Sequence, residues 1–139
     1  IKLDPSRNQD PVTLHDPCNQ SRMGGLADTL RFVLKSAVTN FVEMEPHGNE
    51  NYCCGGGGGT VGFEEIYDFR MQVGGRKKVE QLKATGAKLV AAPCANCKKQ
   101  LRELVDYHGL DMEVVGIHDL VARALVFQSS ERGKIQVVK

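Results

Sequence analysis

The sequence lacks a charge imbalance, a long apolar run and an export signal. Its 18 Lys and Arg residues nearly balance 17 Asp and Glu residues, for a net charge of +1, so charge gives no support for binding nucleic acid or a membrane surface. No apolar run approaches the ~20 residues of a membrane span, and no signal peptide is present. We therefore expect a protein of the reducing cytoplasm.

The sequence also lacks an initiator methionine, since it begins at Ile1. We expect it to be a piece of a longer protein. Its 139 residues fit one domain with a hydrophobic core. Residues 12–127 carry the regular hydrophobic pattern and are the expected domain, whereas residues 1–11 and 128–139 are polar and are expected to be linkers or tails.

Five cysteines in three clusters are the most informative residues present. They are Cys18, the adjacent pair Cys53–Cys54, and the pair Cys94 and Cys97, which are separated by two residues. An odd number of cysteines cannot all pair within one chain, and the missing export signal also disfavours disulfides. The clusters instead indicate thiolates gathered around one metal centre, as in an electron carrier or a thiol-redox enzyme.

Hydrophobic patterning predicts strands that alternate with helices. Strands are expected at 12–15, 41–44, 88–92 and 113–115, and helices at 27–39, from 64 to a break at Gly74–Gly75, at 77–84, at 97–108 and at 117–127. This alternation predicts an α/β fold with a small parallel β-sheet of about four strands flanked by helices. Each cysteine cluster follows a predicted strand, so all three are expected at the carboxyl edge of the sheet, where open α/β sheets place their ligands.

The number and spacing of the thiols favour an iron–sulfur cluster over zinc. Structural zinc takes four ligands, so at least one cysteine would be idle. Adjacent cysteines have Cα atoms only about 3.8 Å apart, which suits two different metal atoms better than one. A cubane with four irons takes four thiolates, so five imply either a spare cysteine or a cluster that is not a cubane. A thioredoxin-like dithiol at Cys94 and Cys97 would leave three cysteines unexplained.

The glycine run that follows Cys54 contains a G-x-G-x-x-G pattern at Gly57, Gly59 and Gly62. A polar loop precedes it and no acidic residue ends a second strand about 20 residues on, so a dinucleotide site is not predicted. The run is either a flexible loop or a close backbone approach to the cluster. Its position favours the second alternative, with Gly55, Gly56 and Gly57 against the cofactor.

Charged residues near the cysteines have two open interpretations. Lys98 and Lys99 lie in the first turn of a helix, where cations are disfavoured, and Arg22 closely follows Cys18. They are either solvated, or they compensate the negative charge of a cluster or of an acidic partner. His15 and His118 follow predicted strands, so each is a candidate second-layer partner of the metal ligands.

The strings HDPCN (15–19), NYCCGGGGG (51–59), KKVEQLKATGAKLV (77–90) and PCANC (93–97) resemble the cysteine-rich CCG domain. They are similar to the catalytic-type subunit of heterodisulfide reductase, and most of all to the iron–sulfur subunit of membrane redox complexes associated with dissimilatory sulfite reductase. The resemblance covers residues 12 to 127. It departs from the family in a longer interval between Cys54 and Cys94, and in having one such domain where relatives usually carry two.

The resemblance implies a non-cubane four-iron, four-sulfur cluster held by Cys18, Cys53, Cys54, Cys94 and Cys97. It implies an oxidoreductase domain that reduces a disulfide or thiol-type substrate, possibly on a small partner protein, with electrons from quinol or other iron–sulfur clusters. The implied partners are a second CCG domain or other iron–sulfur subunits, on the cytoplasmic face of a membrane complex. The alternative is a zinc-stabilised interaction module without redox chemistry.

Overall fold

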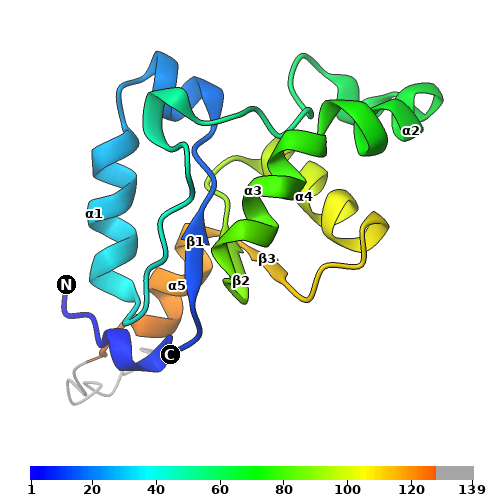
Figure 1. The fold of residues 1–139 in the computed structure, drawn as a ribbon. Coiled ribbons are helices and arrows are strands. Elements are labelled where there is room, and N and C mark those ends of the chain that lie inside the picture. The colour runs from blue at the N-terminus through cyan, green and yellow to red at the C-terminus, as the bar shows by residue number, and fades with distance from the viewer. Residues whose placement is uncertain (128–139) are drawn as a thin grey trace, which may run out of the picture.

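A computed structural model describes residues 1–127, which form a small parallel sheet between two layers of helices (Figure 1). The strands are β1 (Val12–Leu14), β2 (Leu89–Ala91) and β3 (Glu113–Val115), in the order β1-β2-β3. They pair in register, so that Leu14 lies opposite Ala91 and Ala91 opposite Val115. The three strands therefore end at the same edge of the sheet.

Residues 1–127 also contain five α-helices and several single turns. The helices are α1 (Ala27–Ala37), α2 (Tyr67–Phe69), α3 (Arg76–Thr85), α4 (Ala95–Tyr107) and α5 (Ile117–Ala124). Short 3₁₀ turns occupy Pro5–Arg7, Gly48–Glu50, Thr60–Gly62 and Glu64–Ile66, and wider π-helical turns occupy Cys18–Met23 and Arg70–Gly74. Gly86 follows α3 with a φ of +62°, the left-handed conformation that commonly ends a helix.

Each face of the sheet carries its own hydrophobic core. Alternate strand residues point to opposite faces, so Val90 and Val114 join one core with Leu82 of α3 and Leu101 of α4. The other core combines residues of all three strands with α1 and α5, namely Val12, Leu14, Leu89, Ala91, Val115, Leu34, Ala37, Leu120 and Ala124. The helices consequently separate into two layers, with α1 and α5 on one side of the sheet and α3 and α4 on the other (Figure 1).

The predicted α/β class with a small parallel sheet is confirmed, although the sheet has three strands. The expected strand at 41–44 makes only one parallel bridge, between Phe41 and Val12. Beyond that bridge, the carboxylate of Glu43 binds the guanidinium of Arg31 (Nε–Oε2, 2.8 Å) and the chain leaves the sheet. The side-chain ion pair therefore takes the place of further strand pairing.

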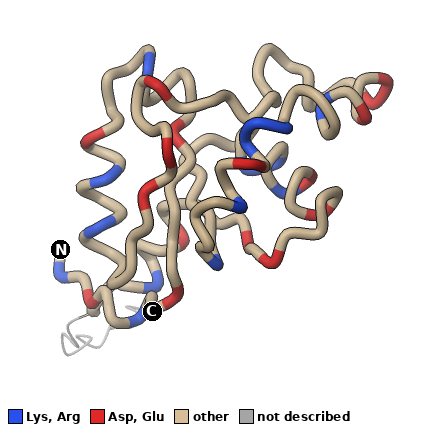
Figure 2. The backbone as a smooth tube through the Cα atoms, viewed as in Figure 1, with Lys and Arg blue, Asp and Glu red and all other residues tan. Residues whose placement is uncertain are grey.

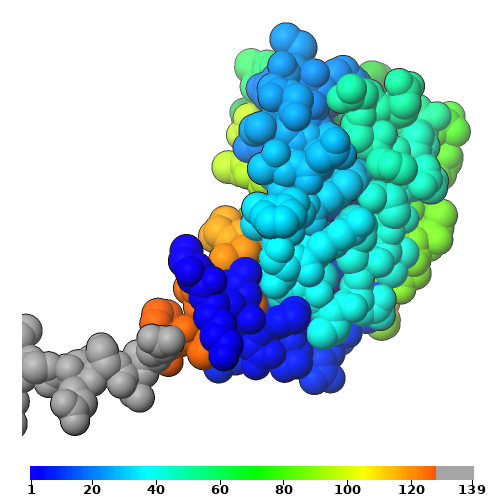
Figure 3. Space-filling model, turned by 90° about the vertical axis from the view of Figure 1, so that its left-hand side faces the viewer, coloured from blue at the N-terminus to red at the C-terminus, as the bar shows by residue number. Residues whose placement is uncertain are grey.

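The N-terminal segment, for which the sequence predicts a linker or tail, packs on the rest of the chain. The side-chain amide of the buried Asn8 donates to the carbonyls of Ala37 and Leu120, at 2.8 and 2.9 Å, and so joins the C-terminal end of α1 to α5. Leu3 bridges to Leu125. In Figure 3 these first residues lie against the end of α5 and below α1. The other expected tail, 128–139, lies outside the described residues.

None of the helices within residues 1–127 combines the length and the apolar character that a membrane-spanning segment requires.

Candidate metal centre

The fold brings all five cysteines to the wall of one cavity of about 270 Å³ at the carboxyl edge of the sheet. Cys18 begins the turn that follows β1, and Cys94 and Cys97 lie at the start of α4, just after β2. Cys53 and Cys54 follow no strand, since 41–44 is not part of the sheet, and reach the cavity on the loop between α1 and α2. Three segments that are distant in the sequence thus supply sulfur to one space.

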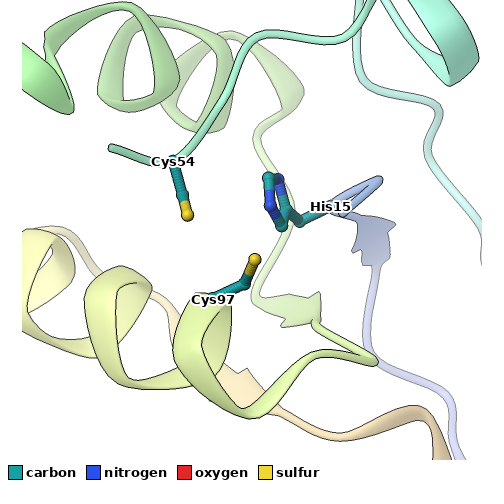
Figure 4. A group of neighbouring side chains, drawn as sticks. All are labelled: His15, Cys54 and Cys97. Carbon is teal, nitrogen blue, oxygen red and sulfur yellow. The ribbon is translucent and has the colours of Figure 1, made fainter. Parts of the chain in front are cut away.

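Three ligand-type side chains form the buried interior of this site. Cys54 and Cys97 are buried, and His15 has no exposed surface. One ligand atom from each of the three lies within 4.8 Å of the others. Figure 4 shows the two sulfur atoms directed toward the space beside the imidazole. Cys18 and Cys94 are half-buried and Cys53 is exposed, so the sulfur ligands run from the interior to the mouth of the cavity.

The thiols are close enough to influence each other's ionisation. Burial, with the neighbouring Cys53, raises the pKa of Cys18. The hydrogen bond with Cys54, followed by burial, raises the pKa of Cys53. The hydrogen bond with Cys53 lowers the pKa of Cys54, but the hydrogen bond with Cys97 and burial outweigh it and raise that pKa to about 12. Crowded sulfurs resist gathering negative charge on their own, whereas a bound metal ion reverses this preference and displaces the protons.

The glycines predicted to face a cofactor differ in what surrounds them. Gly55 has a φ of +87°, and its amide donates to the sulfur of Cys53 at 3.4 Å. At Gly56, an added Cβ would lie 2.7 Å from the Cβ of Gln100, so no side chain fits there. Gly57 has open space around it. Gly56 and Gly57 line the cysteine cavity together with Gly58, whereas Gly55 is absent from its wall.

The two candidate histidines differ in burial and in their position relative to the cysteines. Neither ring nitrogen of His15 has a hydrogen-bond partner among residues 1–127. Burial, assisted by the charge of Lys78 and opposed by that of Asp16, lowers the pKa of His15 to about 3, so the imidazole is neutral. His118 is exposed, with its ring 3.3 Å from the carboxylate of Asp119, and it does not line the cavity. Of these two histidines, only His15 is therefore close enough to the cysteines to act as a partner of the metal ligands.

An ion-pair network fixes the segment between β1 and Cys18. Both carboxylate oxygens of Asp16 accept hydrogen bonds from Arg31, at 2.9 and 2.7 Å. Asp16 also accepts from the hydroxyl of Ser21 and the backbone amide of Gly48, while its carbonyl accepts from the side chain of Asn51. This one aspartate thus ties β1 and α1 to the loop that carries Cys53 and Cys54.

The three predicted cations are all engaged in contacts with the protein. Lys98 pairs with Asp119 (Nζ–Oδ2, 2.8 Å). Lys99 donates to the carbonyl of Val61 at 2.7 Å and so holds the end of the glycine loop. Arg22 donates to the carbonyls of Asn49 and Asn51 on the loop before Cys53. Lys99 and Arg22 therefore hold loops near the cavity, whereas Lys98 binds the first turn of α5.

Sequence reasoning missed a fourth cation, Lys78, which is fully buried. Burial lowers the pKa of Lys78 to about 8, against the opposing effect of Cys54 and other acidic groups. Lys78 belongs to the inward face of α3, three and four residues before the buried Gln81 and Leu82. The helical spacing therefore places Lys78 on the inward face of α3. Sequence reasoning did not assign it there because lysine is seldom fully buried.

The fold and the site together define a class of protein, a parallel α/β domain in which five cysteines line one cavity. The sequence matches a family of cysteine-rich domains. Residues 12–102 match CCG, the cysteine-rich domain. The chain therefore belongs to the CCG cysteine-rich domain family, and the resemblance noted from the four sequence strings is confirmed.

Relatives within this group are subunits of redox enzymes. The chain is 37% identical over 133 residues to the Hdr-like menaquinol oxidoreductase iron-sulfur subunit of Archaeoglobus profundus, covering 91% of this chain and 24% of the relative. It is 36% identical to a subunit of the dihydromethanophenazine:CoB--CoM heterodisulfide reductase of Methanosarcina mazei, over 90% of this chain and 30% of the relative.

A third relative is a subunit of the fumarate reductase (CoM/CoB) of Methanothermobacter marburgensis, which is 34% identical over 89% of this chain and 24% of its own length. The chain thus spans about a quarter to a third of the curated relatives it matches. No solved structure matches it.

Proposed function

We propose that Cys18, Cys53, Cys54, Cys94 and Cys97 hold a four-iron, four-sulfur cluster of the non-cubane kind, and that the chain is the redox domain of a larger oxidoreductase subunit. The observation that carries this proposal is the single cavity lined by all five sulfurs in a member of the CCG family. The relatives' names, which include iron-sulfur and heterodisulfide reductase subunits, support it.

The residues around the cavity fit such a group. The sulfur ligands are soft, which suits iron–sulfur clusters and zinc alike. The cavity of about 270 Å³ is several times the roughly 30 Å³ share of one water molecule in the liquid, more room than a single ion occupies. The unpartnered ring nitrogens of His15 offer an N–H donor to sulfur, and the open space around Gly57 leaves part of the cavity wall free of side chains. A bound cluster would supply the one-electron chemistry that side chains lack.

We infer further that the substrate is a disulfide or thiol, as in heterodisulfide reductases. Reducing a disulfide to two thiols consumes two electrons and two protons, so the domain needs an electron donor. The relatives' names support a menaquinol-type or reduced-phenazine donor reached through other subunits. Those subunits, or a second CCG domain, would connect this domain to the cytoplasmic face of a membrane.

The cluster is tested by anaerobic reconstitution with iron and sulfide, followed by metal analysis. We expect about four irons per chain, with matching sulfide, because one cluster of this type contains four of each. Protein that takes up stoichiometric zinc and keeps iron at background would instead identify a structural zinc module, which the group of His15, Cys54 and Cys97 would also fit.

The substrate is tested with the complete subunit, because a partner domain can complete the site. After oxidation in the presence of candidate dithiols, we expect the electron paramagnetic resonance spectrum to differ from that of a thiol-free sample. The open space around Gly57 and Gly58, which line the cavity, would give the thiol access. Identical spectra with every thiol tried, in a subunit that still transfers electrons, would make the domain an electron relay and exclude the disulfide substrate.

A further inference from the structure

Lys78 is a buried cation in a run of basic residues whose other members face solvent. Figure 2 shows the run, Arg76–Lys78, as one stretch at the start of α3. The side chains of Arg76 and Lys77 are 68% and 58% exposed and pair with Glu80. Lys78, by contrast, has no exposed surface. Its ammonium therefore receives none of the water that normally stabilises a lysine charge.

The hydrogen bonds of Lys78 are those of a charged amine. Its Nζ contacts Oδ1 of Asn51 at 2.6 Å, Oε1 of Gln81 at 2.5 Å and Sδ of Met44 at 3.2 Å. An ammonium group has three donors and no acceptor, so three acceptors match it fully. All three acceptors are neutral, and no carboxylate forms a salt bridge with Lys78 within residues 1–127.

Burying a charge without an ion-pair partner costs free energy, so Lys78 depends on the negative groups around it. Those that act on Lys78 are, in order, Cys54, Asp16, Cys53 and Cys18. Asp16 already binds a cation, Arg31, which it shares with Glu43. The other negative groups that act on Lys78 are the thiolates of the cavity wall, with Cys54 acting most strongly.

We propose that Lys78 is the buried counter-charge of the cysteine cavity, a positioning residue that stabilises the negative charge of metal-bound thiolates and raises the reduction potential of the group they hold. The inference rests on the proposed function in one respect, since it requires the cysteines to be metal ligands. A fixed cation in a medium of low dielectric stabilises the reduced, more negative state more than the oxidised state. Lys78 contributes this charge from behind the ligands, since it does not line the cavity itself.

Asn51 connects the lysine to the ligand loop. Its side-chain oxygen accepts from Lys78, its amide donates to the carbonyl of Asp16, and Cys53 lies two residues further on. Lys78 thus affects the site both through its charge and by holding this loop. Variants that differ in charge and in hydrogen bonding separate the two contributions.

The test compares Lys78→Met, which loses the charge and the hydrogen bonds, with Lys78→Gln, which loses the charge but keeps an amide donor. The matched control is Lys77→Met, which removes a neighbouring charge from the solvent side of the same helix. In reconstituted protein we expect both Lys78 variants to lower the ratio of reduced to oxidised cluster at least tenfold at a fixed potential, a midpoint about 59 mV lower for a one-electron couple. The control is expected to keep the wild-type midpoint.

A second readout uses metal-free protein, so that it does not depend on the cluster. A zinc–thiolate site also carries excess negative charge, and we expect Zn²⁺ affinity, measured by competition with a chelator, to fall at least tenfold in both Lys78 variants and to be unchanged in Lys77→Met. Circular dichroism is recorded alongside, to verify that the fold is retained, and iron content is recorded for the reconstituted proteins. If Lys78→Met does not fold, Lys78→Gln carries both measurements.

The outcomes separate the two proposals. If the wild-type protein takes up no iron–sulfur cluster, the proposed function fails, and the zinc affinities still decide the role of Lys78. If the cluster forms and the Lys78 variants keep the wild-type midpoint and zinc affinity, the counter-charge is wrong and the proposed function stands. A midpoint lowered in Lys78→Met but not in Lys78→Gln would assign the effect to loop positioning and overturn the electrostatic role.

Discussion

Replacing Asp16 by asparagine is expected to destabilise the domain by about 1–3 kcal/mol, the range for leaving buried hydrogen-bonding groups without a partner, because Arg31 keeps its second ion pair, with Glu43. The side chains of Asp16 and Arg31 are only 1% and 10% exposed, so water cannot take the place of the lost carboxylate. Chemical denaturation monitored by circular dichroism measures the loss. Glu80→Gln is the matched control, because it removes an acid from an exposed ion pair and should cost no more than about 1 kcal/mol.

The effect of Asp16→Asn should depend on pH in a defined direction. Burial alone would raise the pKa of Asp16, but the hydrogen bonds from Arg31, Gly48 and Ser21 outweigh it and hold that pKa below its ordinary value of 3.8. A carboxylate whose pKa is lowered by folding stabilises the protein above its ordinary pKa. The difference between wild type and variant should therefore be largest near neutral pH and shrink as the pH falls below 3.8.

The double variant Asp16→Asn, Arg31→Met distinguishes the ion pair from other roles of Asp16. The double variant lacks both partners of this contact, so its loss is counted once and the double variant should be less destabilised than the sum of the single variants. Additive losses would mean that the contacts to Ser21 and Gly48, rather than Arg31, carry the stability.

The architecture was predictable because most of it follows from periodic patterns. Val12, Val90 and Val114 lie in short apolar runs that the sequence separates with helical segments, and these became the three paired strands. Phe41–Met44 has the same local pattern, but the carboxylate of Glu43 binds the guanidinium of Arg31 in α1. A local pattern cannot reveal a partner that only the folded chain brings near, so this fourth strand was overpredicted.

The convergence of Cys18 with Cys94 and Cys97 was predictable for topological reasons, whereas the loop that brings Cys53 and Cys54 to them and the residues behind the cysteines were not. Parallel strands end at one edge, which is enough to bring Cys18 near Cys94 and Cys97. The buried positions of Asn8 and Lys78 depend on specific acceptors, such as the carbonyl of Ala37 and the side chain of Asn51. Polar residues of this kind are usually exposed, so sequence reasoning places them at the surface until the acceptors are known.

The largest effect on the metal site is expected from replacing Cys53 or Cys54 singly by serine. Cys54 is buried between Cys53 and Cys97, and Cys53 is exposed at the mouth of the cavity. Serine is nearly the same size but offers a hard oxygen, which iron–sulfur clusters accept poorly in place of a soft thiolate. We expect each variant to lose most of its iron or to acquire an altered absorption spectrum and midpoint potential after anaerobic reconstitution.

The pair of variants discriminates between two clusters that use the same cavity. A cubane needs four thiolates, so one of the five cysteines would be a bystander, and the exposed Cys53 is the natural one. In that case Cys53→Ser would keep the native iron content, spectrum and potential while Cys54→Ser would not, and the non-cubane assignment would be wrong. Asn96→Ser is the matched control, because Asn96 is an exposed cavity residue without sulfur. It should leave the spectrum unchanged, and a change there would mean that any substitution at the cavity wall disturbs the cluster.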